Sequence, residues 1–268
     1  MANNIKSKTL RVLRNESGVN QADGGTVINE IALNPTTLVK VKVVNNNKIV
    51  LIRHGSTKLN AEDHGGIDVI RGHVDVPLSD HGRKDTYALV ENLHGRVDHL
   101  VTSDLSRATE TAEIISRNSN ISVIGITYHL RPWNLGKFQG EPTLKSMPEI
   151  EYYVRNPDKK VPAKIGDKDS KGESFNTYRD RFLNAVKRIM KENSGKTIGI
   201  VTHYRGLKLM EAWQKNGEPE TNEVDIEEFL RYNKDDRPAT AKEFILENRG
   251  SNYKINIELE FDERRAIV

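Results

Sequence analysis

Between about residues 48 and 216, short apolar runs alternate with amphipathic stretches. The apolar runs predict strands over 48–52, 97–102, 121–126 and 197–202. Apolar residues at helical spacing predict helices over 79–93, 105–117, 174–191 and 206–215. Strands that alternate with helices predict an α/β fold, a three-layer α/β/α sandwich.

The two ends of the chain show a different pattern. Residues 26–33 and 38–44 are β-like runs separated by turn-forming residues, a pattern compatible with a β-hairpin. Residues 253–261 alternate strictly between apolar and polar positions, which predicts a half-buried strand. We therefore expect an N-terminal extension over 1–47, a core over 48–216, and a C-terminal extension over 217–268 that packs on the core, both extensions carrying extra strands.

Composition narrows the class of protein. Hydrophobic residues make up 36% and charged residues 29% of the 268 residues, as in a globular protein with a sizeable core. The apolar runs are too short for a bilayer and no apolar leader opens the chain, so we expect a cytoplasmic protein with no membrane partner. The absence of cysteine excludes disulfides, thiolate metal sites and cysteine nucleophiles.

Charge and histidine spacing exclude two further kinds of site. The net charge of +3 is a weak bias toward anionic ligands, and the basic residues are scattered, so we expect no nucleic-acid partner. The histidines outside the two strand ends discussed below lack metal-ligand spacing. We therefore expect no metal and no cofactor.

Two of the predicted strands run directly into a histidine. The strand over 48–52 is followed by Arg53, His54 and Gly55, and the strand over 197–202 is followed by His203. Open α/β sheets bind ligands at the carboxyl ends of their strands. We therefore expect the two imidazoles to lie beside one substrate.

Two arginines complete this set. Arg53 precedes the first histidine, and Arg107 lies near the first turn of a predicted helix, where its planar fork and the helix dipole both favour a phosphate. Arginines neutralise phosphoryl charge, one imidazole can attack phosphorus, and the other can stabilise the phosphoryl oxygens. The combination favours phosphoryl chemistry.

Five motifs, in this order, resemble those of the histidine phosphatase superfamily, which includes cofactor-dependent phosphoglycerate mutases and broad-specificity phosphatases. The resemblance covers about residues 48 to 216, and the five motifs together are specific. They are Arg-His-Gly-x-x-x-x-Asn at 53–60, Asp-x-Pro-Leu-Ser at 75–79, Ser-x-Leu-x-Arg-Ala-x-x-Thr at 103–111, Gly-Glu-Ser at 172–174, and the late strand that ends in a histidine.

The resemblance implies a phosphoglycerate mutase-like fold and a small phosphorylated substrate. It implies that His54 is the nucleophile that forms a phosphohistidine. It further implies a phosphate pocket of Arg53, Arg107 and His203, with Thr57, Asn60 and Tyr204 as substrate-binding residues.

The chain departs from this family at the proton donor. Pro132 stands where phosphatases of the family carry a glutamate that acts as general acid. Asp63 and Glu141 are equal candidates for a replacement donor, and Asp68 is a third. The longer Glu-Arg-His-Tyr-Gly piece of the mutases is also missing, so a phosphatase is favoured over a mutase.

Three functions therefore remain open. The first is a phosphomonoesterase, the second a catalytically weakened module that binds a phosphorylated ligand, and the third a phosphomutase or phosphotransferase. The extensions could add strands to the sheet, cover the rim of the site or form a homo-oligomer interface. Specificity would come from the loop after Asn60 and from residues 137–150 and 159–173.

Overall fold

The computed structural model describes residues 20–22, 25–34, 37–166, 171–193, 195–232, 237–247 and 253–261. The chain divides into two compact units, one formed by Asn45–Tyr253 and the other by Met1–Val44 with Lys254–Val268. The residues of the predicted site all lie in the larger unit.

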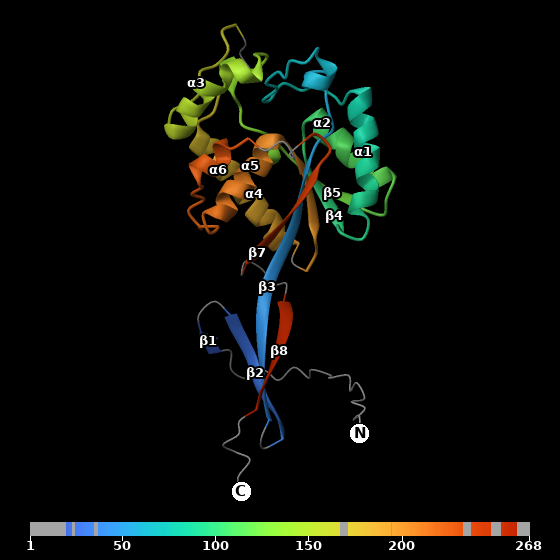
Figure 1. Ribbon diagram of the computed structural model, residues 1–268, viewed down its shortest axis with the longest axis vertical. Helices are drawn as coiled ribbons and strands as arrows, with labels where there is room; N and C mark the ends of the chain where they lie inside the picture. Colours follow the sequence, from blue (N-terminus) through green and yellow to red (C-terminus); the bar gives the residue numbers. More distant parts are fainter. Residues whose placement is uncertain are drawn as a thin grey trace. The chain divides into compact units, whose positions relative to one another are not determined.

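The larger unit is built on a mostly parallel sheet, shown in Figure 1. Four parallel strands follow one another in space, and a fifth strand pairs antiparallel with the first of them. The spatial order is β7 (Ala241–Glu247), β3 (Thr37–Arg53), β6 (Ile198–Thr202), β4 (His99–Ser103) and β5 (Ser122–Thr127).

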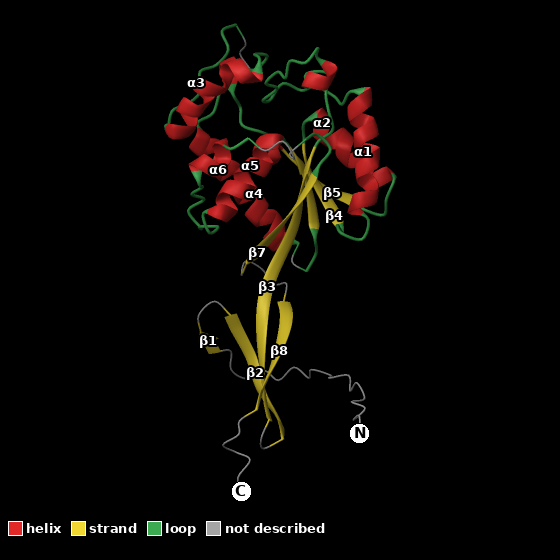
Figure 2. Cartoon of the chain, viewed as in Figure 1, coloured by secondary structure: helices red, strands yellow, loops and turns green. Residues whose placement is uncertain are grey.

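Both faces of the sheet are buried, and β3 shows why. Its side chains alternate, so that Ile49 and Leu51 enter one hydrophobic cluster while Val50 and Ile52 enter the other. Helices α1 (Asp80–Leu93) and α2 (Ser106–Arg117) cover one face. The other face is covered by α3 (Thr143–Arg155), α4 (Phe175–Glu192), α5 (Tyr204–Lys215) and α6 (Ile226–Leu230), as Figure 2 shows. The predicted α/β/α sandwich is confirmed.

The strongly patterned elements begin and end within two residues of their predicted bounds, apart from β3, which extends further toward the N-terminus. The start of α4 is fixed by Ser174, whose hydroxyl accepts a hydrogen bond from the backbone N–H of Thr177 at 3.2 Å, as expected of an N-cap. Single-turn 3-10 helices at Ala61–Asp63, Tyr128–Leu130 and Gly136–Phe138 lie in the loops. None of the described helices is both long enough and apolar enough to span a bilayer.

Three elements of the larger unit were not expected. Helix α3 contains Pro148, and proline in a helix interior removes a backbone donor, which disguises the helical pattern. Helix α6 has only five residues, and β7 lies at the edge of the sheet beside β3. Residues 217–247 of the expected C-terminal extension thus supply α6 and β7 to the larger unit.

The smaller unit contains β1 (Asn20–Ala22), β2 (Gly25–Asn34), the first part of β3, and β8 (Tyr253–Phe261). Strands β2 and β3 pair antiparallel from Thr26 opposite Val43 to Asn34 opposite Thr37, and β8 also pairs with β3. Residues 35 and 36 of the expected turn lie outside the described residues. The expected division at residues 47 and 216 stays a prediction.

Candidate active site

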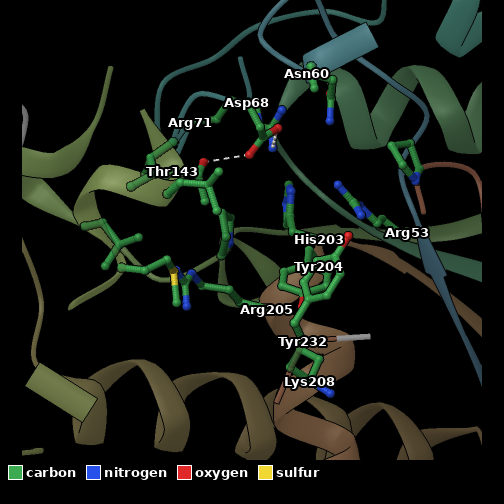
Figure 3. A pocket seen from close by; sticks show the side chains of 18 of the residues that line it. Arg53, Asn60, Asp68, Arg71, Thr143, His203, Tyr204, Arg205, Lys208 and Tyr232 are labelled. Carbon is green, nitrogen blue, oxygen red and sulfur yellow. Dashed lines mark hydrogen bonds and ion pairs between the residues drawn. The ribbon is translucent and has the colours of Figure 1, made fainter. Parts of the chain in front are cut away.

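A pocket of about 810 Å³ opens at the carboxyl ends of β3 and β6 (Figure 3). Its position follows from the parallel sheet, since both strands end at the same edge. Thr57, Asp63 and Glu141 do not line it. The predicted site residues that do line it are Arg53, His54, Asn60, Arg107, His203 and Tyr204.

His54 is buried at the end of β3 with its ring orientation fixed. Its Nδ1 lies 2.6 Å from the carbonyl oxygen of Gly55. Since a carbonyl only accepts, Nδ1 carries the proton and the lone pair lies on Nε2. Burial, and then the positive charges of Arg107 and Arg53, lower the pKa of His54 well below 6.5. The imidazole is therefore neutral at pH 7, as a nucleophile must be.

His203 follows β6 and lies beside His54, with ring centroids 5.1 Å apart and planes 64° apart. Its Nδ1 accepts a hydrogen bond from Nε of Arg107 at 3.3 Å, so its Nε2 donates to the hydroxyl of Ser103 at 3.0 Å. Burial, followed by the charge of Arg107, lowers the pKa of His203 well below 6.5. The structure thus brings the two predicted histidines together.

The turn after β3 requires glycine because it packs directly on α1. A Cβ at Gly55 would lie 2.4 Å from the carbonyl oxygen of Gly82, and a Cβ at Gly82 would lie 2.0 Å from the carbonyl oxygen of Ser56. These distances are well below van der Waals contact, so neither position accepts a side chain without a backbone shift. Two glycines therefore set the place of His54.

The side chain of Arg107 is buried and held by backbone carbonyls. Its Nη1 donates to the carbonyl of Val74 at 2.8 Å and its Nη2 to that of Gly72 at 2.9 Å. Burial lowers the pKa of Arg107, and the neighbouring charge of Arg71 lowers it further. The guanidinium lies at the pocket with its orientation fixed and without a carboxylate partner among the described residues.

Arg71 is a further arginine of the pocket, and no sequence motif predicted it as a site residue. Its guanidinium lines the pocket, and its charge contributes to the lowered pKa of His54, His203 and Arg107. Its Nη2 donates to Asp68 at 3.3 Å, whereas its buried Nη1 has no hydrogen-bond partner in the described part of the chain. A buried donor without a partner costs free energy unless a ligand satisfies it. Arg71 therefore adds a third arginine to the anion site.

Thr57 and Asn60 bind each other. The side-chain oxygen of Asn60 accepts from the backbone N–H of Thr57 at 2.8 Å and from its hydroxyl at 3.1 Å. Thr57 is fully buried away from the pocket, whereas Asn60 lines it, and the Asn60 amide nitrogen donates to no described residue. Thr57 therefore positions Asn60, and Asn60 is the one that faces a ligand.

Tyr204 begins α5 directly after His203 and is half-buried at the pocket wall. The centroid of its ring lies 5.2 Å from Cζ of Arg53, in cation–π contact. The ring thus restricts where the guanidinium of Arg53 lies.

The segment that carries Pro132 is held in place by three polar residues. Nε2 of His73 donates to the carbonyl of Pro132 at 2.9 Å, and Arg181 donates to the same carbonyl at 3.2 Å. Arg181 is also paired with Glu173 at 2.7 Å, and Glu173 accepts from the backbone N–H of Asn134 at 2.9 Å. The Gly-Glu-Ser motif therefore fixes the wall of the pocket where a glutamate was expected.

The two carboxyls ranked first as replacement proton donors lie away from the pocket. Asp63 accepts from the hydroxyl of Ser79 at 2.7 Å, which ties it to the start of α1. Glu141 takes part in hydrogen bonds through its backbone. Asp68 does line the pocket, but its oxygens already accept from Arg71 at 3.3 Å and from Thr143 at 2.6 Å.

Residues 49–226 match the histidine phosphatase superfamily (branch 1), which is two thirds of the chain. The chain belongs to the histidine phosphatase superfamily. The match begins within β3, at Ile49, and ends with the first residue of α6, so it contains every residue of the pocket up to that point.

Two plant proteins are similar in sequence to this chain. The chain is 34% identical over 163 residues to phosphoglycerate mutase-like protein 4 of Arabidopsis thaliana, a match that covers 58% of this chain and 66% of the relative. It is 29% identical over 164 residues to a metal-independent phosphoserine phosphatase of the same plant, covering 58% and 63% respectively. The chain thus spans a little under two thirds of the length of these two relatives.

Solved structures share the fold. A mycobacterial glucosyl-3-phosphoglycerate phosphatase in complex with VO3 superposes with a TM-score of 0.54 at 21% identity, covering 79% of this chain and 98% of that one. YhfR of Bacillus stearothermophilus superposes with a TM-score of 0.56 at 25% identity, covering 79% and 96%. The expected phosphoglycerate mutase-like fold is confirmed.

Proposed function

We propose that this protein is a phosphatase that hydrolyses a phosphomonoester through a phosphohistidine on Nε2 of His54. In the first step the Nε2 lone pair attacks phosphorus, the P–O ester bond breaks, and the leaving oxygen takes up a proton. In the second step water attacks the phosphohistidine, the P–N bond breaks, and inorganic phosphate leaves. Neutral His54 is regenerated, so protons and charge balance over the cycle.

The observation that carries this proposal is the hydrogen bond from Nδ1 of His54 to the carbonyl of Gly55. It holds the imidazole in the tautomer whose Nε2 is free to attack, and the lowered pKa keeps that nitrogen unprotonated. A histidine that only filled space at a strand end would not need either property.

The charges around His54 suit the transition state of phosphoryl transfer. Arg53, Arg71 and Arg107 all line the pocket and all contribute to the lowered pKa of His54. Each can neutralise charge on the phosphoryl oxygens, and Asn60 can add a neutral donor. His203 lies beside the nucleophile. Its Nε2 can donate to the same phosphoryl oxygens once the substrate displaces the hydroxyl of Ser103, its present partner.

The pocket offers no evident proton donor among its described residues for the oxygen of the leaving group. Pro132 occupies the expected position of the general acid, and the side-chain oxygens of Asp68 are already engaged by Arg71 and Thr143. We therefore infer that the rate depends steeply on the acidity of the leaving group. Aryl phosphates should react much faster than alkyl phosphates, since they need little or no proton transfer.

Names of relatives support hydrolysis or phosphoryl transfer by this family. One plant relative is a phosphoserine phosphatase and another is a phosphoglycerate mutase-like protein. We favour hydrolysis because the longer piece that mutases carry is missing from this sequence. Transfer of the phosphoryl group to an added alcohol in preference to water would favour the phosphotransferase alternative.

The test compares the wild type with His54→Ala and with the matched control His94→Ala, which changes an exposed histidine on the surface. Wild type and control should hydrolyse 4-nitrophenyl phosphate, and His54→Ala should lose about 10³-fold or more of kcat/KM. Rapid quenching should trap an acid-labile, base-stable phosphoryl group on the wild type alone. Equal turnover in all three proteins would refute the proposal, and tight phosphate binding without turnover would favour the binding module.

A further inference from the structure

One wall of the pocket holds a guanidinium that the proposed phosphate chemistry does not use. Arg205 is the second residue of α5, and its side chain lines the pocket. Its Nη2 lies 3.9 Å from the sulfur of Met147, and its Cζ lies 5.9 Å from the centroid of the Trp133 ring. A thioether is a weak acceptor, and an aromatic face attracts a cation only modestly. Within the described residues, Arg205 thus has no carboxylate in ion-pair contact.

Arg205 lies apart from the phosphate site. After burial itself, the charges that lower the pKa of His54 are those of Arg107, Arg53 and Arg71. Arg205 instead interacts electrostatically with Tyr178, Tyr204 and Asp68. Figure 3 shows Arg205 and Arg53 on opposite sides of His203. A ligand that reaches both would span the pocket.

The surroundings of Arg205 are largely apolar. Burial lowers the pKa of Arg205, which reflects the cost of holding a charge there. That cost is offset where an anion joins the charge. The apolar residues that line the pocket include Trp133, Leu135, Met147, Phe229 and Leu230, and of these Trp133 and Met147 lie against Arg205.

The charges lining the pocket exceed what one phosphoryl group needs. Seven of its described lining residues are arginine or lysine, and two are aspartate or glutamate. Arg53, Arg71 and Arg107 already surround the proposed site of phosphoryl transfer. Lys208 is paired with Glu211 at 2.5 Å. The remaining three are Lys145 and Arg237, which are exposed, and Arg205, which is partly buried and so lies inside the pocket beyond the phosphate site.

We propose that Arg205 binds a carboxylate of the substrate, so that this protein acts on phosphomonoesters that also carry a carboxylate. A carboxylate matches the planar fork of one guanidinium in geometry and in charge. A second phosphate would carry more charge than a single guanidinium balances. This inference rests on the proposed function for its phosphoryl chemistry, but the carboxylate site can be tested separately by binding.

The first measurement uses the wild type with matched substrates. These are the meta and para isomers of (carboxymethyl)phenyl phosphate and the primary amide of each. The methylene insulates the phenol from the group that changes, so the two members of a pair have similar leaving groups. For at least one isomer the carboxylate should exceed the amide in kcat/KM by about 10- to 100-fold, the usual worth of a charge-assisted hydrogen bond. Equal values for both isomers would overturn the proposal.

The second measurement assigns the preference to a residue. Arg205→Met should reduce the carboxylate-to-amide ratio to near one, and Arg205→Lys should keep part of it. Arg117→Met is the matched control, because Arg117 is exposed on α2 and pairs with Glu113, and its ratio should equal that of wild type. Lys145→Met tests the exposed lysine at the pocket mouth. Collapse of the ratio in Lys145→Met, or its full retention in Arg205→Met, would overturn the assignment.

A third measurement separates this inference from the proposed function. Calorimetry compares binding of the (carboxymethyl)phenyl phosphonates and their amides, which cannot be hydrolysed, to the wild type and Arg205→Met. If no phosphate ester is hydrolysed but the wild type binds the carboxylates more tightly in an Arg205-dependent way, the proposed function fails and the carboxylate site stands. If esters are hydrolysed through His54 and the carboxylates have no advantage over the amides, the proposed function stands and the carboxylate site fails. If Arg205→Met does not fold, the carboxylate-to-amide ratios of wild type and Arg205→Lys are compared instead. A lower ratio in Arg205→Lys supports the assignment to Arg205, and equal ratios overturn it.

Discussion

The hydroxyl of Thr111 accepts a hydrogen bond from the backbone N–H of Gly55 at 3.1 Å. It also donates to the carbonyl of Arg107, one turn earlier in α2, at 2.8 Å. One hydroxyl therefore connects the glycine next to the proposed nucleophile with the helix that carries Arg107, the arginine proposed to bind phosphate. This explains why the Arg-Ala-x-x-Thr spacing accompanies Arg-His-Gly.

Thr111→Val should test this link. Valine keeps the shape of threonine but leaves the buried N–H of Gly55 without an acceptor, so the free energy of unfolding should fall by about 1–3 kcal/mol. We expect kcat to fall about tenfold with little change in KM, because the position of His54 is disturbed more than the binding of the substrate. Urea denaturation and steady-state kinetics measure the two effects.

Thr109→Val is the matched control, since the hydroxyl of Thr109 donates to the carbonyl of Ser106 within the same helix. It should affect kcat by less than about twofold, because it touches no group at the pocket. A similar loss of kcat in both variants would contradict the proposed role of Thr111.

Pro132→Glu should supply the missing general acid. The carbonyl of Pro132 is held by His73 and Arg181, so the position of the residue is fixed by its backbone and a new side chain would start at the pocket wall. General acids contribute about 10²–10⁴-fold, and an unoptimised one should raise kcat/KM for alkyl phosphates at pH 5.5 by about tenfold. Pro132→Gln, which cannot donate a proton of suitable acidity, should give no such gain. A flat response of alkyl phosphates to Pro132→Glu would count against our explanation of the leaving-group dependence.

Asp68→Asn tests whether Asp68 donates a proton to the leaving group or only orients Arg71. Because the oxygens of Asp68 already accept from Arg71 and Thr143, we expect Asp68 to take no part in protonating the leaving group. The dependence of kcat/KM on leaving-group pKa, measured with a series of substituted phenyl phosphates, should keep its slope. KM should fall about twofold to fivefold, because one negative charge is removed from an anion site. A steeper slope would identify Asp68 as the donor.

The fold could be predicted from the sequence wherever local pattern and tertiary role agree. Strand β6 is buried throughout and apolar up to Thr202, and α4 has a complete apolar stripe, so periodicity and capping residues were sufficient. Helix α3 carries Pro148 inside it, and tertiary packing of Ile150, Tyr153 and Val154 overrides the low propensity. The edge strand β7 was missed because its pairing with β3 is a long-range contact that no local pattern reports.

The site was predictable only where motifs mark it. His54, His203 and Arg107 lie at strand ends or in a helix first turn, positions that topology brings together. Arg71 lies in a loop and Arg205 in the first turn of α5, where single arginines are usually surface residues. The available signal for Arg71 was its place between two family motifs, and for Arg205 its spacing of two residues after His203. Their convergence on one pocket depends on how the loops fold back.

Stability should depend on pH through the two buried histidines. The folded-state pKa values of His54 and His203 are lowered well below 6.5, whereas the unfolded chain keeps ordinary values near 6.5. As pH falls through 6.5 the unfolded state binds protons that the folded state does not, so the free energy of unfolding falls. Each histidine contributes up to about 1.4 kcal/mol per pH unit in this range and nothing to the slope above about pH 7.5.

Urea denaturation between pH 7.5 and 5 measures this slope. His54→Gln should show a shallower loss of stability than the wild type over that range, since one of the two groups no longer titrates. His94→Gln, which changes an exposed histidine, should follow the wild type. Parallel curves for wild type and His54→Gln would mean that the pKa of His54 is not lowered by folding.

Glu173→Gln should weaken the wall that carries Pro132. Glu173 and Arg181 are mostly buried, with side-chain exposures of 14% and 11%, and their contact is 2.7 Å. Removing the negative charge leaves Arg181 uncompensated, so the free energy of unfolding should fall by about 2–4 kcal/mol. Glu149→Gln is the control: it breaks an exposed ion pair with Lys137 and should cost less than about 1 kcal/mol. Equal costs in chemical denaturation would contradict the structural role assigned to the Gly-Glu-Ser motif.

Arg107 is oriented by the carbonyls of Gly72 and Val74, which fix its direction, and it makes no ion pair with a carboxylate among the described residues. The folded protein therefore carries a concentrated positive charge that a dissolved anion can complete. Its melting temperature should accordingly depend on the choice of buffer salt, being higher in phosphate or sulfate than in chloride at equal ionic strength. An anion present at 100 times its dissociation constant would add about 2.7 kcal/mol to the free energy of unfolding. Phosphate would then preserve the enzyme during storage while competing with its substrate in the assay.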